Sequence, residues 1–192
     1  MTGMSLRHAL LGLLADRPGS GWDLLKRFEV SLAFVWPATQ SQLYTELGRM
    51  TDEQLVEVIS TGARNRKEYA ITDTGRQELA RWITDIEPER NRRNDALLRV
   101  FFLWAVDPQA ARSYLEKEAA VFQQFHARLE QVEATVDWDD SAFDRYGRIA
   151  LEHGLRLAAT NEEWARWAAN QVDLPAKPVK GGAVKPTKSR QA

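Results

Sequence analysis

The chain has 192 residues, 44% of them hydrophobic, with seven tryptophans and no cysteine. This length can hold one large or two small domains, and the apolar content is sufficient for a core, which excludes a disordered protein. The absence of cysteine excludes disulfides, thiolate catalysis and most structural zinc sites, and it favours a cytoplasmic location. No apolar run reaches the roughly 18 residues that a membrane span needs. The short apolar stretch at the N-terminus is interpreted as an amphipathic helix rather than a signal peptide.

The formal net charge of −1 provides no global attraction for nucleic acid. Residues 1–90 carry 11 Lys and Arg against 13 Asp and Glu, and residues 91–172 carry 10 against 13. Residues 173–192 carry five basic residues and one acidic residue. Any affinity of the main body for DNA must therefore come from a local cluster of cations.

Capping residues predict three helices in the first part of the chain. Ser5 is expected to cap the first helix, and Ser20 the second. The second helix should end before Trp36, because the residue before a proline avoids the helical region. Thr39 and Gln42 have the spacing of a capping box and are expected to begin a third helix.

A hairpin and a fourth helix are predicted next. Residues 55–60 and 69–72 alternate apolar and polar side chains, and the segment between them contains the cationic tip T-G-A-R-N-R-K. Thr72 or Asp73 is expected to cap the fourth helix. This helix carries the apolar residues Leu79, Trp82, Ile83 and Ile86. Helices followed by such a hairpin are typical of a winged helix-turn-helix, which places one helix in the major groove and the wing beside the phosphates.

The pattern beyond Pro88 is wholly helical. Residues 96–106 are strongly apolar, Asp107 with Pro108 begins a long helix, and Ser141 caps a last one. The stripe predicted to be apolar on the last helix comprises Phe143, Tyr146, Ala150, Leu157, Trp164 and Trp167. Long amphipathic helices without a third layer to cover them usually pair with another chain.

These patterns predict a mainly α fold with three parts. Residues 1–90 are expected to form a winged-helix DNA-binding domain with a two-stranded wing. Residues 91–172 are expected to form an α-helical domain for dimerisation and effector binding. The Pro-, Gly- and Lys-rich residues 173–192 are expected to be a disordered tail.

The third helix and the hairpin carry the candidate DNA contacts. Amides can read adenine through two hydrogen bonds, hydroxyls reach bases or phosphates, and Arg and Lys neutralise phosphates. The candidates are Thr39, Gln40, Ser41, Gln42, Tyr44, Arg49, Arg64, Arg66 and Lys67. Helix capping is an equally good interpretation of Thr39 and Gln42. Tyr44 has the alternative of packing against the second helix, and an Arg-rich turn by itself is usually a solvated loop.

Aromatic residues in the second half are candidates for a pocket that holds a small effector. They are Phe101, Trp104, Phe122, Trp164 and Trp167. Core and interface packing is the favoured interpretation, because stripes at helical spacing usually mark a core. The three histidines are isolated, and we find no phosphate-binding loop, nucleophile elbow or matched acid/base pair. We therefore expect no metal, no cofactor and no enzymatic activity.

Four stretches within residues 6–79 together resemble the PadR family of transcriptional regulators. They are L-R-H-A-L-L-G-L-L, G-S-G-W-D-L-L-K-R-F, F-V-W-P-A-T-Q-S-Q-L-Y-T-E-L-G-R-M and R-K-E-Y-A-I-T-D-T-G-R-Q-E-L. The two-helix second half is similar to the longer subgroup that includes AphA-like regulators, whose C-terminal helices serve dimerisation. The resemblance implies that Ser41 and Tyr44 lie near the phosphate backbone and that aromatic ligands bind near the dimer interface.

One position departs from the family pattern. The family usually has a glycine before the first wing strand, where this chain has Gln54. Glycine would provide a left-handed helix cap there, and glutamine can adopt that conformation at a cost of roughly 1 kcal/mol.

The predicted function is transcriptional regulation by a homodimer. The protein is expected to bind double-stranded DNA at a pseudo-palindromic operator, to act as a repressor, and to be released by a small aromatic or amphipathic effector. The alternative is a winged-helix protein-interaction module without specific DNA binding, which the net negative charge favours. A gel shift with the DNA upstream of the gene distinguishes the two.

Overall fold

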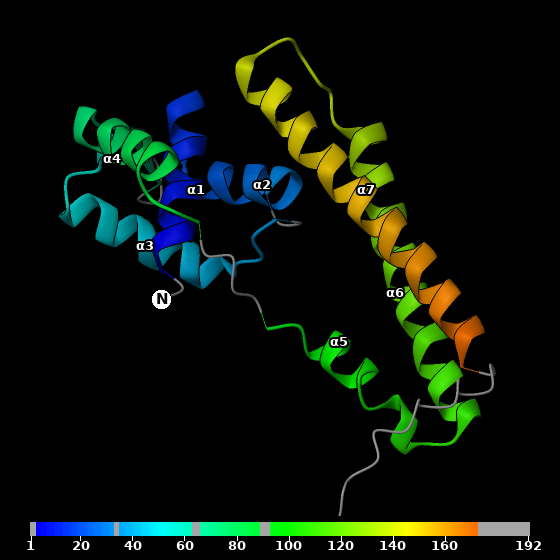
Figure 1. Cartoon of the computed structure of the whole chain (residues 1–192). Helices are drawn as coiled ribbons and strands as arrows, with labels where there is room; N and C mark the ends of the chain where they lie inside the picture. Colours follow the sequence, from blue (N-terminus) through cyan, green and yellow to red (C-terminus); the bar gives the residue numbers. More distant parts are fainter. Residues whose placement is uncertain (1–2, 33–34, 63–65, 89–92, 173–192) are drawn as a thin grey trace, which may run out of the picture.

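The computed structural model describes residues 3–32, 35–62, 66–88 and 93–172 (Figure 1). It shows a compact N-terminal unit beside a long helical hairpin, as expected for a mainly α winged-helix protein with C-terminal helices. The N-terminal unit consists of α1 (Gly3–Asp16), β1 (Gly19–Ser20), α2 (Gly21–Ser31), α3 (Gln40–Asp52), β2 (Val56–Thr61), β3 (Lys67–Ile71) and α4 (Asp73–Thr84). Among the described residues, no helix is both long and apolar enough to span a bilayer.

Side-chain caps fix where the helices of this unit begin. The Ser20 hydroxyl accepts a hydrogen bond from the backbone N–H of Asp23, and the Thr39 hydroxyl accepts one from that of Gln42. Thr72 does the same for the backbone N–H of Gly75 at the start of α4, at 3.0 Å. These three predicted caps are confirmed. The first helix is different, because α1 begins at Gly3 and Ser5 lies inside it.

Helix α1 is the centre of the N-terminal core and contacts α2, α3, α4 and β3. The fully buried side chains include Leu10, Leu11, Leu13, Leu14, Leu24, Phe28, Leu43, Leu47 and Met50. Burying each one contributes about 1.5–3 kcal/mol, so this unit has an apolar core of its own. Of the apolar residues of α4, Ile83 is 64% exposed. Leu79 packs against the core, and α4 meets α1 through Trp82, which stacks on the buried His8.

The sheet has three antiparallel strands in the order β1–β3–β2. Strands β2 and β3 form the predicted wing. Strand β1 was not predicted, because two residues are too few to show an alternating pattern. The register shifts between Val58 and Ser60, so Ile59 lies in a bulge. Bulges increase the local twist of a hairpin, and this one lies within the wing.

Gln54 adopts the left-handed conformation that glycine would favour at this position, with φ of 58°. The backbone N–H of Leu55 donates to the carbonyl of Met50 at 2.9 Å, the bond that ends a helix in a Schellman motif. The Thr72 hydroxyl donates to the Gln54 carbonyl at 2.7 Å. Hydrogen bonds to Met50 and from Thr72 therefore fix the turn from α3 into the wing, while Gln54 at its centre has a strained backbone.

Replacing Gln54 with glycine is expected to raise the free energy of unfolding by about 0.5 kcal/mol. Relief of the left-handed conformation gains roughly 1–2 kcal/mol, and the added entropy of glycine in the unfolded chain cancels part of it. Urea unfolding measures the difference. Gln54→Ala is the control, because alanine keeps the Cβ and the strain. Equal midpoints for the two variants would contradict the assignment of strain to this residue.

The C-terminal half consists of α5 (Asp95–Val100), the short helix η2 (Leu103–Ala105), α6 (Pro108–Thr135) and α7 (Ala142–Gln171). Asp107 caps α6 with Pro108 at its first position, and Ser141 caps α7, as predicted. Figure 1 shows α6 and α7 packed along one another as a hairpin.

The buried face of α7 consists mainly of small residues, and it is not the face of the predicted stripe. The buried residues are Leu151, Gly154, Ala158, Ala165, Ala168 and Ala169. Small side chains let two helix axes approach closely, so the hairpin closes on this face. Of the stripe predicted from the sequence, Tyr146 is 71% exposed, and Leu157 and Trp167 also face solvent. These three large side chains of α7 thus remain largely uncovered by the described part of the chain.

The two halves touch at the start of α7. Phe143 packs against the N-terminal core, and the guanidinium of Arg27 lies 5.7 Å from the centre of its ring. Arg27 itself is anchored within the N-terminal unit by Asp16, at 2.6 Å. The contact joins α2 to the hairpin.

Candidate nucleic-acid interface

Helix α3 presents a polar face to solvent. Its buried residues Leu43, Leu47 and Met50 recur every three or four positions and fix the rotation of the helix. Gln40, Ser41, Gln42, Tyr44 and Thr45 lie on exposed positions. The candidate contacts predicted on this helix therefore share its solvent side.

Thr39 and Gln42 cap each other. The Gln42 side-chain oxygen accepts hydrogen bonds from the backbone N–H of Thr39 at 2.8 Å and from its hydroxyl at 3.1 Å. Capping is therefore one role of both residues. Both are also exposed, and the N-terminus of a helix attracts anions, so capping does not remove them from the candidate surface.

Tyr44 lies where α3, α2 and the wing meet. Its ring packs so closely on Gly21 that a Cβ there would lie 2.5 Å from the ring atom Cε1, yet the residue is 42% exposed. Burial, and next the neighbouring Tyr44, raise the pKa of the wing residue Tyr69. The predicted packing of Tyr44 on the second helix is therefore present together with exposure, and glycine at position 21 makes room for it.

The wing residue Arg66 is tied to the start of α2. Its Nη2 donates to both carboxylate oxygens of Asp23, at 2.8 and 3.0 Å. The pKa of Asp23 lies below its usual range, first because the Ser20 hydroxyl donates to the carboxylate and further because Arg66 does. Lys67 is exposed at the first position of β3. Arg64 lies outside the described residues.

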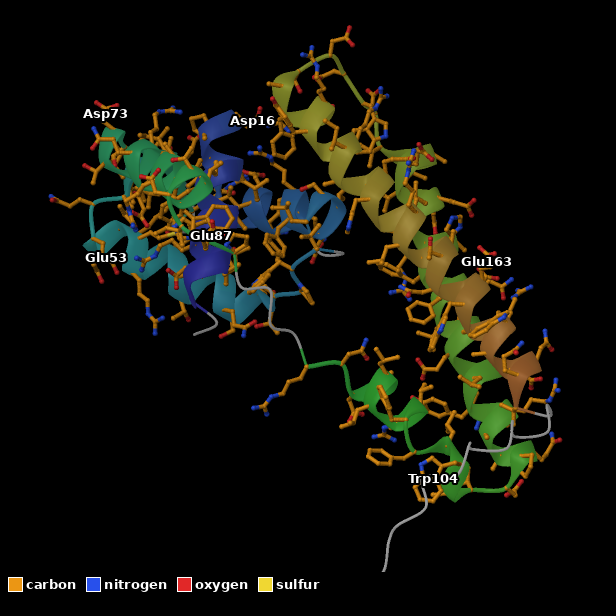
Figure 2. The ribbon with its side chains drawn as sticks, viewed as in Figure 1. Asp16, Glu53, Asp73, Glu87, Trp104 and Glu163 are labelled. Atoms are coloured by element: carbon orange, nitrogen blue, oxygen red, sulfur yellow. The ribbon has the colours of Figure 1, made fainter. Side chains whose placement is uncertain are left out.

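A second ionic cluster fixes α3 against α1. The Arg7 guanidinium donates one hydrogen bond to the buried Glu46, at 2.9 Å. It donates two more to the carboxylate of Glu53, at 2.7 and 2.8 Å. Arg49 lies 3.6 Å from the other oxygen of Glu46. Figure 2 shows Glu53 at the end of α3. A buried carboxylate needs such partners. Through Glu46, Arg7 fixes the rotation of α3 about its axis, and through Glu53 it fixes the C-terminal end of the helix against α1.

Carboxylates therefore offset much of the predicted cationic surface. Arg49 is paired with Glu46 and Arg66 with Asp23, whereas Lys67 forms no ion pair within the described part of the chain. Sequence reasoning missed Arg7 and Asp23, because their partners lie about 40 residues away and no local pattern marks such a pair.

The five candidate effector residues are spread over several elements. Phe101 and Trp104 (81% exposed) belong to the α5–η2 segment, and Figure 2 shows Trp104 at the lower end of the molecule. Trp167 is exposed on α7, Phe122 is partly buried on α6, and Trp164 packs against a small core with Leu115, Ala168 and Ala169. Their role in binding an effector stays a prediction.

The described histidines do not suggest a metal site. In this part of the chain, no group of three or more His, Cys, Asp or Glu residues is arranged to hold a metal ion. His8 is buried, lies 3.0 Å from a carboxylate oxygen of Glu78 and stacks on Trp82 with ring centres 4.6 Å apart. It helps to hold α4 on α1.

Both halves of the chain match models of known protein families. Residues 10–81 match the Transcriptional regulator PadR-like family, and residues 92–173 match Virulence activator alpha C-term. The Negative transcriptional regulator PadR of Bacillus subtilis is 30% identical over 177 residues, covering 88% of this chain and 97% of the relative. The Probable transcriptional regulator Rv1176c of Mycobacterium tuberculosis is 41% identical over 98 residues, covering 49% of this chain and 52% of the relative.

Solved structures show the same similarity. Bacillus subtilis PadR in complex with operator DNA has a TM-score of 0.75 and 25% identity, covering 88% of this chain and 99% of that chain. The same protein in complex with p-coumaric acid gives the same values. The Vibrio cholerae virulence activator AphA shares the fold, with a TM-score of 0.73, 22% identity, and coverage of 87% and 97%. The relatives are transcriptional regulators and not enzymes.

Proposed function

We propose that this chain, which belongs to the PadR-like family of transcriptional regulators, represses transcription by binding a pseudo-palindromic operator as a homodimer. The observation that carries the proposal is the exposed polar face of α3 next to a two-stranded wing. The operator complex of the Bacillus subtilis relative supports it. Such a regulator acts where the chromosome is, so we also propose a cytoplasmic location.

In this proposal α3 enters the major groove and the wing follows the phosphate backbone. Gln40 and Gln42 offer amides to base edges, while Ser41 and Tyr44 offer hydroxyls to phosphates. Thr39 and Arg49, at the two ends of α3, and Lys67 of the wing complete the surface, and Arg66 lies next to Lys67 in the chain. The buried residues of α3 and the clamp by Arg7 hold this face in one orientation.

Uncovered apolar side chains support the homodimer. The exposed ones in the C-terminal half are Leu97, Leu98, Phe101, Phe102, Trp104, Val106, Val121, Tyr146, Ile149, Leu157 and Trp167. A monomer rarely exposes so many large apolar groups over a few neighbouring elements. A second copy that covers them would form a symmetric dimer, whose two winged helices bind half-sites one helical turn or a multiple apart.

A small aromatic or amphipathic effector is proposed to release the operator. The complex of the Bacillus subtilis relative with p-coumaric acid supports this class of molecule. The aromatic residues Phe101, Trp104, Phe122, Trp164 and Trp167 are the candidates for contacting it. Release requires that the effector bind the DNA-free arrangement more tightly than the DNA-bound one. The contact of Arg27 with Phe143 joins each winged helix to the helices that would change position.

Replacing Lys67 with glutamine is expected to weaken DNA binding and to flatten its salt dependence. Each lost phosphate contact reduces the slope of log affinity against log salt by about 0.9. Fluorescence anisotropy with labelled upstream DNA at several KCl concentrations gives the slope. Lys117→Gln, which removes the same charge from the exposed side of α6, is the control. A wild-type slope for Lys67→Gln would exclude the wing lysine from the interface.

A further inference from the structure

We propose that Asp23 limits the affinity of this protein for DNA by holding the wing residue Arg66 in an ion pair that connects the wing to α2. In this state the positive charge of Arg66 is withheld from the phosphate backbone. The inference rests on the proposed DNA-binding function. It assigns to Arg66 a positioning role in place of the phosphate contact that the sequence suggests.

The Asp23 carboxylate is fixed before DNA arrives. It lies in the first turn of α2, where its Oδ2 accepts hydrogen bonds from the backbone N–H of Ser20 at 3.0 Å and from the Ser20 hydroxyl at 2.6 Å. Ser20 is itself buried and belongs to the edge strand β1. Because the carboxylate also caps its own helix, it cannot turn away from the wing without opening that cap.

Arg66 reaches this carboxylate from the residue just before β3. Strand β3 pairs with β1, and Ser20 lies opposite Glu68 in that pairing. The ion pair between Arg66 and Asp23 therefore connects the wing to α2, next to the short ladder that connects β3 to β1. An ion pair that reinforces a two-residue ladder restrains the wing relative to α2, and through Gly21 and Tyr44 relative to α3.

The pair also has an electrostatic consequence. The Asp23 side chain is 38% exposed and that of Arg66 is 60% exposed, so a phosphate that approached Arg66 would meet the negative charge of Asp23 as well. Glu68, which accepts a hydrogen bond from the Ser60 hydroxyl across the wing at 2.9 Å, adds a negative charge on β3 itself. A neutralised arginine releases fewer counterions than a free one. Lys67 next to it has no such partner among the described residues.

This arrangement should lower affinity equally for all DNA sequences. Phosphate contacts carry no sequence information, whereas the side chains of α3 can read bases. Weakening the phosphate term leaves discrimination by α3 unchanged and reduces binding to the rest of the chromosome. The affinity of this acidic winged-helix unit for DNA then depends more on base contacts by α3 than on phosphate contacts by its cations.

The test compares Asp23→Asn with the wild-type full-length protein. Two labelled duplexes of about 30 base pairs, long enough for two half-sites, serve as probes, one of mixed sequence and one from the upstream region of the gene. Asp23→Asn should tighten binding to both duplexes by about fivefold per protomer. This factor corresponds to the repulsion of about 1 kcal/mol between two negative charges about 4 Å apart in water. The salt slope of Asp23→Asn should steepen by up to about 0.9 per protomer.

Two further variants make the result specific. Adding Arg66→Gln to Asp23→Asn should remove the gain in affinity and slope. Arg66→Gln alone should change the slope of log affinity against log salt by less than half as much as Lys67→Gln does. This comparison tests the inference even if the Asp23→Asn protein does not fold. Glu152→Gln, which breaks an exposed ion pair with Arg156 on α7, is the control for the change in net charge and should bind as the wild type does.

The outcomes separate this inference from the proposed function. If the wild type binds both duplexes and Asp23→Asn binds no more tightly, or Arg66→Gln flattens the slope as much as Lys67→Gln, Asp23 does not limit affinity and Arg66 contacts phosphate. The proposed function survives that result. If the wild type binds neither duplex, both the proposed function and this inference are overturned.

Discussion

Replacing Gly75 with alanine should lower the free energy of unfolding by about 3 kcal/mol or more, the upper range for overpacking a rigid site. A Cβ on Gly75 would overlap the carbonyl oxygen of Leu55 and lie 2.9 Å from the side chain of Ile71. That carbonyl already accepts hydrogen bonds from the backbone N–H of Thr72 at 3.1 Å and from its hydroxyl at 3.0 Å. The overlap is with backbone held on both sides, so a small rotamer change cannot relieve it.

Gly12→Ala is the matched control for Gly75→Ala. Gly12 lies inside α1, and a Cβ there meets no atom within 4 Å. Alanine in a helix interior is favoured over glycine by about 0.5–1 kcal/mol, so this variant should be slightly more stable than the wild type. Urea unfolding followed by circular dichroism measures both. Similar midpoints for the two variants would show that α4 does not pack on the start of β2 as described.

Truncating the chain after Pro88 should produce a folded monomer that binds the operator about 100-fold to 10,000-fold more weakly. The N-terminal unit has its own core, to which the hairpin adds Phe143. Two half-site contacts held in one dimer bind with a high effective concentration, and separating them loses that advantage. The loss should be large here because carboxylates offset the cations of each unit.

Light scattering determines the mass of the truncated protein, and anisotropy with the upstream duplex determines its affinity. Circular dichroism and a cooperative urea transition show whether it is folded. A folded truncated protein that remains a dimer would contradict the assignment of the dimer interface to the C-terminal half. A folded monomer with full affinity would contradict the need for two half-sites.

Local signals predicted much of the N-terminal unit. Ser20 and Thr39 were identified as caps, and Thr72 as one of two candidates, because a cap and its partner lie only three residues apart. The resemblance to the family, which usually has glycine there, marked Gln54 as the position of the turn after α3 where a left-handed conformation matters. Such features depend on interactions between residues that are close in the sequence, so a short sequence pattern is enough to predict them.

Features that depend on distant partners could not be predicted. Arg7 meets Glu53, and Arg66 meets Asp23, across more than 40 residues. Helical periodicity on α7 located an apolar stripe with Tyr146 and Trp167, but it could not show that α6 would cover another face, made mainly of small residues. Periodicity shows that a face is apolar and does not identify what covers it.

The central claim is that this acidic protein recognises a specific DNA sequence through α3 and the wing. Anisotropy titrations with the DNA upstream of the gene and with an unrelated duplex of equal length, at one fixed salt concentration, test it most directly. We expect the upstream duplex to bind at least about 1,000-fold more tightly, the lower range for specific binding, and Tyr44→Ala to weaken that complex. Equal affinity for the two duplexes, or no binding to either, would contradict the claim.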